Sequence, residues 1–473
     1  MKKFKKVLAL SLALAMGLSL VACGDNGSGD TTAPVDGGDA SSEDTGDAGD
    51  TTGGEGSEFY IYVWNDEFKD IMGNYLPGFT LADDKTGGTM EDGTKIVFVT
   101  NESTDMKYQT ELDKALQGGA QVDMFLVEAD YATKYTSAEA GVAMDVKELG
   151  FTDDDLANMY TYAKDVVTDA NGVTRGVSWQ CAPGFFAYRR DIADEVLGVS
   201  DPAKVQEYVK DWTTFEDTAK KMKDAGYYMV SDYTEGSRNF NAVRSTPWVS
   251  DGVVQVPAEI DEWTDMAKGW YDKGYMHGGD NFAGDGNWGA DMKEDGKCFG
   301  YFACTWYLNF CMYPNATPAD QASETYKWGI CQGPSAYYWG GTWLCASSTC
   351  SNTDLAYNIM YSLTADVDIM KQMAQQDLNF ANNKQAMSEF ADEFTGSDKF
   401  AWLDLGDENY FSMCVKFADA IEVKNMTQYD QIIETYQSCA AEYFNGTVAT
   451  KEEAIDNFYT KITEKYQELS RPE

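Results

Sequence analysis

Continuous apolar runs alternate with helically spaced apolar positions in the first part of the folded chain. The runs typical of strands buried on both faces are Phe59–Trp64, Ile96–Val99 and Val122–Val127. Between them, apolar residues recur at helical spacing, first as far as Pro77 and then from Met106 to Gly118. This strand–helix–strand–helix–strand order predicts an α/β fold with a parallel, doubly wound sheet.

Two segments that carry polar side chains directly follow these predicted strands. They are Trp64-Asn65-Asp66-Glu67 and Glu128-Ala129-Asp130-Tyr131. Ligands of doubly wound sheets bind beyond the carboxyl ends of the strands. We therefore expect both segments to contribute to a binding site.

Helix-start signals become frequent later in the chain. Thr213-Thr214-Phe215-Glu216 and Thr450-Lys451-Glu452-Glu453 have the capping-box pattern, and apolar residues at helical spacing follow each of them. The run Asp153-Asp154-Asp155 is interpreted as a helix start rather than a metal site. All three features are structural signals.

The N-terminal segment has the pattern of a secretory signal. Residues 1–22 join a lysine-rich head to the apolar run Val7–Val21, which is too short for a good transmembrane helix. The sequence Leu20-Val21-Ala22-Cys23 resembles the bacterial lipobox, in which the cysteine is acylated. The alternative is an ordinary signal peptide with a chance cysteine. Residues 23–57 are then the lipidated Cys23 and a disordered acidic tether, because this segment has too little apolar surface to fold.

The charge and aromatic content narrow the function classes. The formal net charge is −42 at pH 7, and the signal contains lysines but no acidic residue, so the mature chain is more acidic still. This charge argues against nucleic acid, anionic headgroups and highly charged anionic ligands as partners. The 12 Trp, 29 Tyr and 23 Phe suggest aromatic surfaces for a ligand, with compositional bias as the alternative.

The chain contains a single histidine, His277. This nearly excludes His-based metal sites and Ser-His-Asp catalysis, and we expect His277 in an exposed loop. Acidic and amide side chains gather in the Gly-rich loop that follows, at Asp280, Asp285, Asn287 and Asp291. Their spacing does not match an EF-hand, so a solvated loop is favoured and neither metal nor cofactor is expected.

Nine cysteines remain after Cys23, and none stands in a CxxC motif. Zinc and thioredoxin-like sites are therefore weakly supported. Export favours disulfides, whereas an anaerobic host would leave the thiols as small buried apolar groups. The odd number leaves at least one thiol free.

Several segments match the order of motifs in one family of binding proteins. The matching segments are Tyr60–Asn65 as an opening strand, Val122–Val127 as a "P-D-apolar-apolar" strand with Val for Pro, Ala140–Val146 as "G-x-L-x-x-L", Asn171–Asp191 as a "DGK-x-x-G-x-P … YN-x-D" crossover, Gly296–Ala303 as "GK-x-A-M", and Phe444–Ile455 as a final turn and helix. Together they resemble the extracellular solute-binding protein family 1, the maltose-binding-protein-like receptors of carbohydrate ABC importers.

The resemblance implies a two-lobe, periplasmic-binding-protein-like (type II) α/β fold with three hinge crossings. The crossings are expected near Gln180–Pro183, Gly333–Tyr338 and Leu378–Lys384. The N-terminal lobe would comprise residues 58–180 plus 335–380, and the C-terminal lobe residues 181–334 plus 381–473. A ligand would bind between the lobes, which close around it.

Sugars bind to flat aromatic faces and to planar hydrogen-bonding groups. Asp130 stands where maltose-binding proteins use an Asp against sugar hydroxyls, and Trp306 follows the strand after which the family commonly stacks an aromatic on sugar. The expected ligand-binding residues are Trp64, Asn65, Glu67, Glu128, Asp130, Tyr131, Gln180, Trp248, Trp306, Trp339, Gly340 and Trp343. Trp64 and Trp343 could instead pack in the core, and Glu67 and Glu128 could face water.

The sequence therefore predicts a non-enzymatic, lipid-anchored subunit of an ABC importer that captures a carbohydrate, with an oligosaccharide favoured. It would act as a monomer on the outer face of the cytoplasmic membrane of a Gram-positive cell, with separate permease and ATPase chains. A peptide or another small solute is the alternative ligand. A surface glycoside hydrolase is a further alternative, and it needs two carboxylates about 5–10 Å apart. A surface adhesin would more naturally be a β-sandwich.

Overall fold

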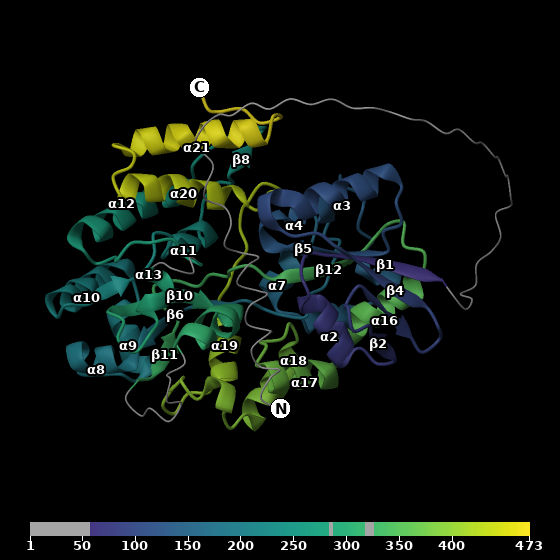
Figure 1. The fold of residues 1–473 in the computed structure, drawn as a ribbon, viewed down its shortest axis with the longest axis horizontal. Helices are drawn as coiled ribbons and strands as arrows, with labels where there is room; N and C mark the ends of the chain where they lie inside the picture. Colours follow the sequence, from purple (N-terminus) through teal and green to yellow (C-terminus); the bar gives the residue numbers. More distant parts are fainter. Residues whose placement is uncertain (1–56, 283–286, 317–325) are drawn as a thin grey trace, which may run out of the picture.

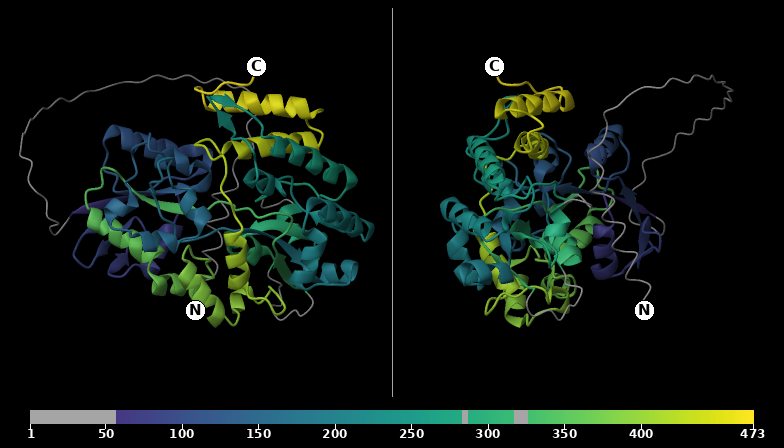
Figure 2. Two further views of the ribbon diagram at one scale, coloured as in Figure 1. Left: turned by 180° about the vertical axis from the view of Figure 1, so that it is seen from behind. Right: turned by 60° about the vertical axis from the view of Figure 1, so that its left-hand side comes forward.

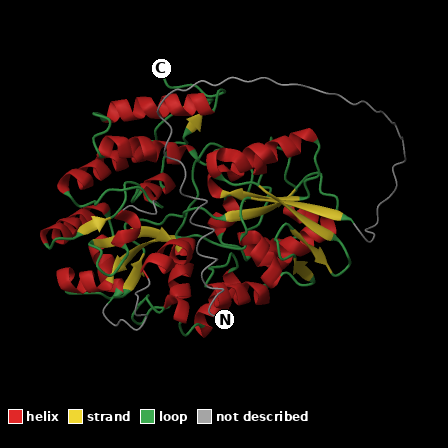
Figure 3. Cartoon of the chain, viewed as in Figure 1, coloured by secondary structure: helices red, strands yellow, loops and turns green. Residues whose placement is uncertain are grey.

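Two helix-covered β-sheets lie side by side and form the centres of two lobes (Figures 1 and 3). The computed structural model describes residues 57–282, 287–316 and 326–473. The predicted signal, Cys23, all of the tether before Ser57, and Asp285 lie outside these residues. The predicted α/β class is confirmed.

The first sheet has six strands in the order β12-β5-β1-β4-β3-β2. Its strands are β1 (Glu58–Val63), β2 (Phe79–Leu81), β3 (Gly87–Met90), β4 (Lys95–Thr100), β5 (Met124–Glu128) and β12 (Thr342–Ala346). The parallel arrangement predicted for the apolar runs is confirmed, since Ile61 of β1 pairs with Phe98 of β4 and with Met124 of β5. The sequence did not predict β12, which returns from far along the chain and pairs antiparallel with β5.

Short helices surround the first sheet (Figure 1). They are α2 (Glu67–Tyr75), η1 (Thr104–Met106), α3 (Lys107–Gly118), η2 (Ala129–Tyr131), α4 (Ala132–Thr136), α5 (Val146–Leu149), α6 (Asp153–Ala157), α7 (Thr161–Asp165), α16 (Thr353–Thr364), α17 (Val367–Asp377) and α18 (Lys384–Glu393). Gly119 ends α3 in the left-handed region, with φ 72°. The three aspartates from Asp153 begin α6 as predicted, and Thr152 caps it.

The second sheet has four strands in the order β11-β6-β10-β7, and β8 pairs with β9 in a separate hairpin. The strands are β6 (Gly184–Arg189), β7 (Tyr228–Val230), β8 (Val249–Ser250), β9 (Val253–Val254), β10 (Cys298–Cys304) and β11 (Trp328–Cys331). The antiparallel neighbours of β6 are β10 and β11, while β7 runs parallel to β10. The carboxyl ends of β7 and β10 therefore lie on one edge of this sheet.

The helices of the second half cover this sheet and extend along one side of the molecule, where α20 and α21 pack together (Figures 1 and 2). They are α8 (Arg190–Leu197), α9 (Pro202–Val209), α10 (Trp212–Asp224), α11 (Ser237–Ala242), α12 (Ala258–Lys273), α13 (Asn287–Asp291), α14 (Thr305–Tyr307), the π-helical turn η3 (Leu308–Met312), α15 (Tyr313–Ala316), η4 (Asp398–Phe400), α19 (Tyr410–Asp419), α20 (Ile432–Phe444) and α21 (Lys451–Lys465).

One of the two predicted helix starts is displaced. The capping box of α10 begins at Asp211, whose carboxylate accepts a hydrogen bond from the Thr214 backbone N–H at 2.7 Å, so the predicted start at Thr213 is wrong. A carboxylate is the stronger acceptor for this orphan donor, which explains the earlier start. The start at Thr450 is confirmed, since its hydroxyl accepts a hydrogen bond from the Glu453 backbone N–H at 3.2 Å.

Three chain segments run between the two sheets next to one another. Antiparallel bridges join Gln180 to Ala381 and Pro183 to Tyr338. The buried Ser178 hydroxyl lies 2.7 Å from the Gln180 carbonyl and 2.7 Å from the Thr342 carbonyl. These are the segments expected to be hinges, and their hinge role and the exact lobe limits stay predictions.

Buried apolar side chains form two clusters, a larger one around the first sheet and the crossings and a smaller one in the second lobe. All nine cysteines of the described residues are free thiols, and all but Cys350 are buried. They behave as small apolar core groups, the second of the two alternatives open for them. Within the part of the chain that the structure describes, none of the helices has the length and apolar character needed to cross a bilayer.

Candidate functional site

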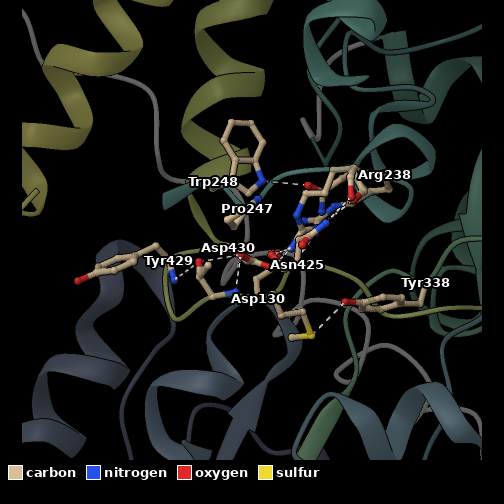
Figure 4. Close-up of polar contacts among 12 residues, drawn as sticks. Asp130, Arg238, Pro247, Trp248, Tyr338, Asn425, Tyr429 and Asp430 are labelled. Atoms are coloured by element: carbon tan, nitrogen blue, oxygen red, sulfur yellow. Dashed lines mark hydrogen bonds and ion pairs between the residues drawn. The ribbon is translucent and has the colours of Figure 1, made fainter. Parts of the chain in front are cut away.

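The strand ends of the two sheets meet through an ion pair. Asp130 belongs to η2, which directly follows β5, while Arg238 belongs to α11, which follows β7. The Arg238 Nη1 atom donates to Asp130 Oδ1 at 2.9 Å and to Oδ2 at 2.7 Å (Figure 4). The two side chains are only 11% and 9% exposed, so the contact lies between the lobes and largely out of solvent.

Backbone contacts fix the position of Asp130. The Gln431 backbone N–H donates to the Asp130 carbonyl at 3.0 Å, which ties the start of α20 to the first lobe. The Asp130 backbone N–H donates to the Glu128 carboxyl at 2.9 Å and so caps η2. Burial, and then the Asp130 charge, raise the pKa of Glu128 well above its usual range. A neutral Glu128 offers one hydroxyl donor and one acceptor to a solute.

Four aromatic residues lie next to the carboxyl groups of Glu128 and Asp130. Trp306 follows β10, and its indole N–H donates to the Trp339 carbonyl at 2.7 Å. The Trp306 and Trp339 rings meet edge-on with centroids 5.2 Å apart, and Tyr307 and Phe282 pack on Trp339. The Arg238 guanidinium lies 5.8 Å from the centre of a Trp339 ring, within cation–π range.

Gly340 joins the acidic and aromatic parts of the site. A Cβ atom at this residue would lie 3.4 Å from Glu128 Oε1 and 3.4 Å from Trp306 Nε1. Its φ of 67° lies in the left-handed region, where glycine is favoured. The glycine therefore lets the crossing segment pass close to both side chains, and Glu128, Trp306 and Trp339 converge on one place between the sheets.

Two further cations flank Arg238. A small cavity of about 10 Å³ lies here, about the minimum for one water. It is lined by Asp130, Arg238, Asn241, Ala242, Arg244, Tyr338 and Lys424. Arg244 pairs with the buried Asp430, and burial raises the pKa of Asp430 to about 6 (Figure 4). Beside the site, the cations Arg238 and Arg244 are therefore each paired with a carboxylate, Asp130 and Asp430.

A larger cavity, of about 330 Å³, lies in the segment that connects α18 to α19. The residues that line it include Phe394, Phe400, Leu405, Asn409 and Tyr410. None of the sequence-predicted site residues lines this cavity, and neither do Asp130 and Arg238. The convergence of side chains from both sheets, rather than cavity size, identifies the candidate site.

Residues 85–401 match the family model described as bacterial extracellular solute-binding protein. The chain belongs to this family. The match covers more than half of the chain and includes the strands from β3 to β12, so the resemblance found in the sequence is confirmed. No curated protein sequence matches the chain.

Solved structures of solute-binding proteins have the same fold. A crystal structure of an extracellular solute-binding protein family 1 member has a TM-score of 0.66 and 16% identity, covering 85% of this chain and 98% of that one. The ABC-transporter-associated binding protein of B. animalis subsp. lactis Bl-04, in complex with β-1,6-galactobiose, has a TM-score of 0.61 and 17% identity, covering 88% and 100%. The galacto-N-biose/lacto-N-biose I-binding protein of Bifidobacterium longum, in complex with lacto-N-biose, has a TM-score of 0.62 and 14% identity, covering 89% and 100%. The two-lobe, type II fold is confirmed.

Three residues predicted to touch the solute lie in the cores of this solute-binding protein. Trp248 is 0% exposed, and its indole N–H donates to Asn241 Oδ1 at 2.9 Å (Figure 4). Trp343 is 1% exposed, and its indole N–H donates to the Ala163 carbonyl at 2.7 Å. Tyr131 is buried beside Tyr135. Burial of the three apolar rings, together with the satisfied N–H groups of the two tryptophans, places all three side chains outside the site.

The other predicted residues occupy the first lobe and the crossing. Trp64 is half-buried, one residue past β1, and packs edge-on against Tyr108 at 5.2 Å. Asn65 accepts a hydrogen bond from the Glu67 backbone N–H at 3.0 Å, and burial raises the pKa of Glu67 to about 7. Gln180 is buried in the middle crossing segment. The contacts given for Trp64, Asn65 and Glu67 stay within the first lobe.

Two expectations about polar residues need correction. His277 is not a free loop side chain, because it stacks on Tyr228 at 4.2 Å and its Nδ1 atom lies 2.8 Å from Asp291 Oδ2. Asp291, expected in a solvated loop, is buried and also accepts the Ser231 hydroxyl at 2.7 Å. Among the described residues, no group of three or more His, Cys, Asp and Glu side chains is arranged to hold a metal ion.

Arg238 was not among the site residues predicted from the sequence. It follows the carboxyl end of β7, the kind of position from which the other site residues were chosen. The three residues of β7 are too few to give a strand signal, so the sequence does not mark the segment after them as a strand end. The sequence signal that could have indicated Arg238 is an arginine just after a strand, in a chain with few basic residues.

Proposed function

We propose that this solute-binding protein is a non-enzymatic receptor that captures a carbohydrate between its two lobes for an ABC importer. The convergence of Glu128 and Asp130 from one lobe with Trp306 and Arg238 from the other is the observation that carries the proposal. A solute held there would contact both lobes at once, as a receptor that closes on its ligand requires.

The side chains at this place suit a sugar. The half-buried indoles of Trp306 and Trp339 present flat apolar faces for the C–H faces of a pyranose. Burial raises the pKa of Glu128 and so favours its neutral form, which can donate and accept, while Asp130 accepts and Arg238 donates. Hydroxyl groups need both kinds of partner. The proposed site therefore comprises Glu128, Asp130, Arg238, Trp306, Trp339 and Gly340, with Trp64, Asn65, Glu67 and Gln180 as residues that a longer solute would reach.

Similar structures support the ligand class. The relatives from B. animalis subsp. lactis and Bifidobacterium longum hold β-1,6-galactobiose and lacto-N-biose. Both ligands are neutral disaccharides, and a neutral solute suits a chain with a formal net charge of −42. An oligosaccharide is therefore favoured over a charged peptide.

The proposed anchor is the lipid on Cys23, followed by the acidic tether. It would hold the receptor at the outer face of the cytoplasmic membrane, beside permease subunits with separate ATPase chains. In cells that express the protein, labelling with a palmitate analogue and membrane fractionation test the anchor. We expect Cys23→Ser to abolish both the label and the membrane association. A labelled Cys23→Ser variant would remove Cys23 as the lipidated residue.

Thermal unfolding of the purified protein tests the ligand class. Maltose, cellobiose, β-1,6-galactobiose and lacto-N-biose are compared with tri- and tetrapeptides. A ligand at 100 times its Kd stabilises the folded state by about 2.7 kcal/mol, which raises Tm by a few degrees. A shift with saccharides alone supports the proposal, whereas a shift with peptides alone contradicts it. Chromatography of the incubated sugars checks for hydrolysis products, which would reveal an enzyme instead.

A further inference from the structure

Glu235 carries a buried carboxyl group in the loop between β7 and α11. The residue is 3% exposed, and it lies two residues before the start of α11 and three before Arg238. The Trp263 indole N–H of α12 donates to the Glu235 carbonyl at 2.9 Å, which holds the backbone of the loop. Glu235 is therefore fixed close in sequence to a side chain of the proposed site.

The Glu235 carboxyl takes the place of a strand partner for β10. The pairs between β7 and β10 run from Cys298 to Gly300, and β10 continues beyond them. The next N–H on this side, that of Phe302, donates to Glu235 Oε2 at 2.7 Å. A buried backbone N–H needs an acceptor, and here a side chain supplies it. One carboxyl oxygen thus joins the β7–α11 loop to the strand that leads to Trp306.

The remaining hydrogen-bond contact of this carboxyl is with the side chain of Asp232. Among the described residues, no amide, amine or hydroxyl group donates to Glu235 Oε1. Asp232 is also 3% exposed, and its Oδ1 atom accepts the Thr234 backbone N–H at 2.7 Å and the Thr234 hydroxyl at 2.6 Å. Two carboxyl groups can bond to one another only when one carries a proton. The two bonds from Thr234 favour the charge on Asp232, which leaves the proton on Glu235.

The surroundings of the pair favour this shared proton over a second negative charge. Burial, and then the Asp232 charge, raise the pKa of Glu235 well above its usual range. The other titratable groups around the pair are His277, Asp280, Asp291, Cys298, Tyr301, Tyr307 and Tyr337. Of these only His277 can become positive, and its Nδ1 atom lies against Asp291 at 2.8 Å.

We infer that Glu235, protonated and bonded to Asp232, is a positioning residue for the proposed solute site. The inference rests on the proposed function and deepens it. The Glu235 carboxyl ties Phe302, four residues before Trp306, to the loop that begins α11, so Trp306 and Arg238 keep their places relative to each other. An ionised Glu235 would repel the negative Asp232 in a buried place, and the loop would move away from β10.

Two variants of Glu235 separate positioning from packing. Glu235→Gln keeps an acceptor for the Phe302 N–H and a donor for Asp232, so the Kd should stay within about threefold of the wild type. Glu235→Leu keeps neither, and the Kd should rise at least about tenfold. Titration calorimetry at pH 7 uses whichever of maltose, cellobiose, β-1,6-galactobiose and lacto-N-biose binds most tightly. A folded Glu235→Leu variant with an unchanged Kd would overturn the inference, and so would an equal loss of affinity in both variants.

Thr264→Val is the matched control for a lost buried hydrogen bond in the second lobe. Thr264 is 1% exposed on α12, and its hydroxyl donates to the Ile260 carbonyl at 2.8 Å. This variant should lower Tm and leave the Kd unchanged. If Thr264→Val weakens binding as much as Glu235→Leu does, the effect is general destabilisation and the positioning role is overturned.

Infrared spectroscopy tests the protonation state of Glu235 without any solute. The C=O stretch of a protonated carboxyl group is separate from the bands of a carboxylate. We expect the wild-type spectrum at pH 7, minus that of Glu235→Gln, to show one protonated carboxyl band that shifts in D2O. A carboxylate signal in its place would overturn the inference, whether or not Glu235→Leu folds.

The outcomes distinguish this inference from the proposed function. An unchanged Kd in Glu235→Leu overturns the positioning role and leaves the carbohydrate receptor standing. Binding of a peptide in place of every saccharide contradicts the carbohydrate ligand, and the same variants measured with that peptide decide the role of Glu235. A protein that binds neither saccharides nor peptides contradicts both proposals.

Discussion

The Arg238 guanidinium and the Asp130 carboxylate form an ion pair that joins α11 of the second lobe to η2 of the first. One nitrogen, Nη1, reaches both carboxylate oxygens, at 2.7 and 2.9 Å. Because both side chains are largely buried, each depends on the other for compensation of its charge. The pair therefore couples the two lobes more strongly than an exposed ion pair would.

A double-mutant cycle on Arg238→Met and Asp130→Asn tests this coupling. Each single change should lower the free energy of unfolding, because it leaves a buried polar or charged group without its partner. The double variant should lose less than the sum, with a coupling free energy on the order of 1–3 kcal/mol in urea denaturation. The same cycle on the exposed pair Lys210 and Glu207 should give less than about 1 kcal/mol. Additive losses at Arg238 and Asp130 would contradict the coupling.

Trp306→Ala should weaken solute binding and leave the protein folded. The half-buried indole presents one face to the proposed site, and its N–H bond to the Trp339 carbonyl sets the ring orientation. We expect the Kd for a saccharide ligand to rise about 10- to 100-fold, corresponding to about 1.4–2.8 kcal/mol. Isothermal titration calorimetry measures the Kd, and circular dichroism checks the fold. Trp402→Phe, a change in a buried ring outside the site, should leave the Kd unchanged.

Trp248→Ala should mainly affect stability. The side chain is fully buried against Tyr436 and Phe458, and its N–H donates to Asn241. Removing it leaves a cavity and an unpaired amide oxygen, so the free energy of unfolding should fall by about 3–5 kcal/mol. Urea denaturation measures this loss. A stable Trp248→Ala variant with weakened saccharide binding would instead return Trp248 to the site.

The parallel arrangement of β1, β4 and β5 in the first sheet was predictable because its signals are local. The runs around Ile61, Phe98 and Met124 are apolar on both faces, and the intervening helical patterns require parallel crossovers. The antiparallel strand β12 was not predictable in this way. Its pairing with β5 joins residues far apart in the sequence, and no local pattern encodes such a partner.

Prediction of the site was also limited to signals that are local in the sequence. Strand ends located Glu128 and Asp130, and the family motif located Trp306, because each signal lies within a few residues of the side chain. Whether an aromatic residue lines the site or fills a core depends on distant neighbours. Trp248 follows Thr246-Pro247 and Trp339 follows Tyr337-Tyr338; neither local sequence indicates burial, yet Trp248 is fully buried and Trp339 half-buried. Arg238 gains its significance only from Asp130, which lies in the other lobe.

The stability of the protein should decrease between pH 5 and pH 7. Burial raises the pKa of Glu67 to about 7 and those of Asp232 and Asp430 to about 6, above the values of about 3.9–4.3 expected in the unfolded chain. In this window the unfolded chain has already lost protons that the folded chain still holds, so the free energy of unfolding falls as pH rises. Above about pH 8 these groups are ionised in both states, and their contribution to the free energy of unfolding becomes constant. Urea denaturation at several pH values measures the slope.

The variant Glu67→Gln isolates one of these groups. In this variant the free energy of unfolding should fall by about 1–2 kcal/mol less between pH 5 and pH 7 than in the wild type. A shift of one pKa unit corresponds to 1.36 kcal/mol, and the value is discounted because Glu67 keeps some contact with water. His277→Gln removes the only imidazole of the chain and should leave most of the decrease in place. A wild-type protein whose stability rises across this window would contradict the assignment.

Reducing agents should leave the fold unaffected. All nine cysteines from Cys181 to Cys439 are free thiols. Burial raises the pKa of the Cys331 thiol to about 12, which favours its protonated, unreactive form. We expect the same Tm with and without excess dithiothreitol. Mass spectrometry after alkylation in denaturant should find all nine cysteines modified without prior reduction. A lower Tm in dithiothreitol would reveal a stabilising disulfide.

The return of β12 to the first sheet affects how the chain can fold as it emerges. Residues 129–341 separate β5 from its antiparallel partner, so the β5 edge stays unpaired until most of the polypeptide has been made. An exposed strand edge is a site of incorrect pairing, and a sheet that lacks an edge strand gains little stability. Early folding of this sheet is therefore disfavoured, which would suit export of the chain in an unfolded state, as the predicted signal segment implies. The last pairing would then form only after export.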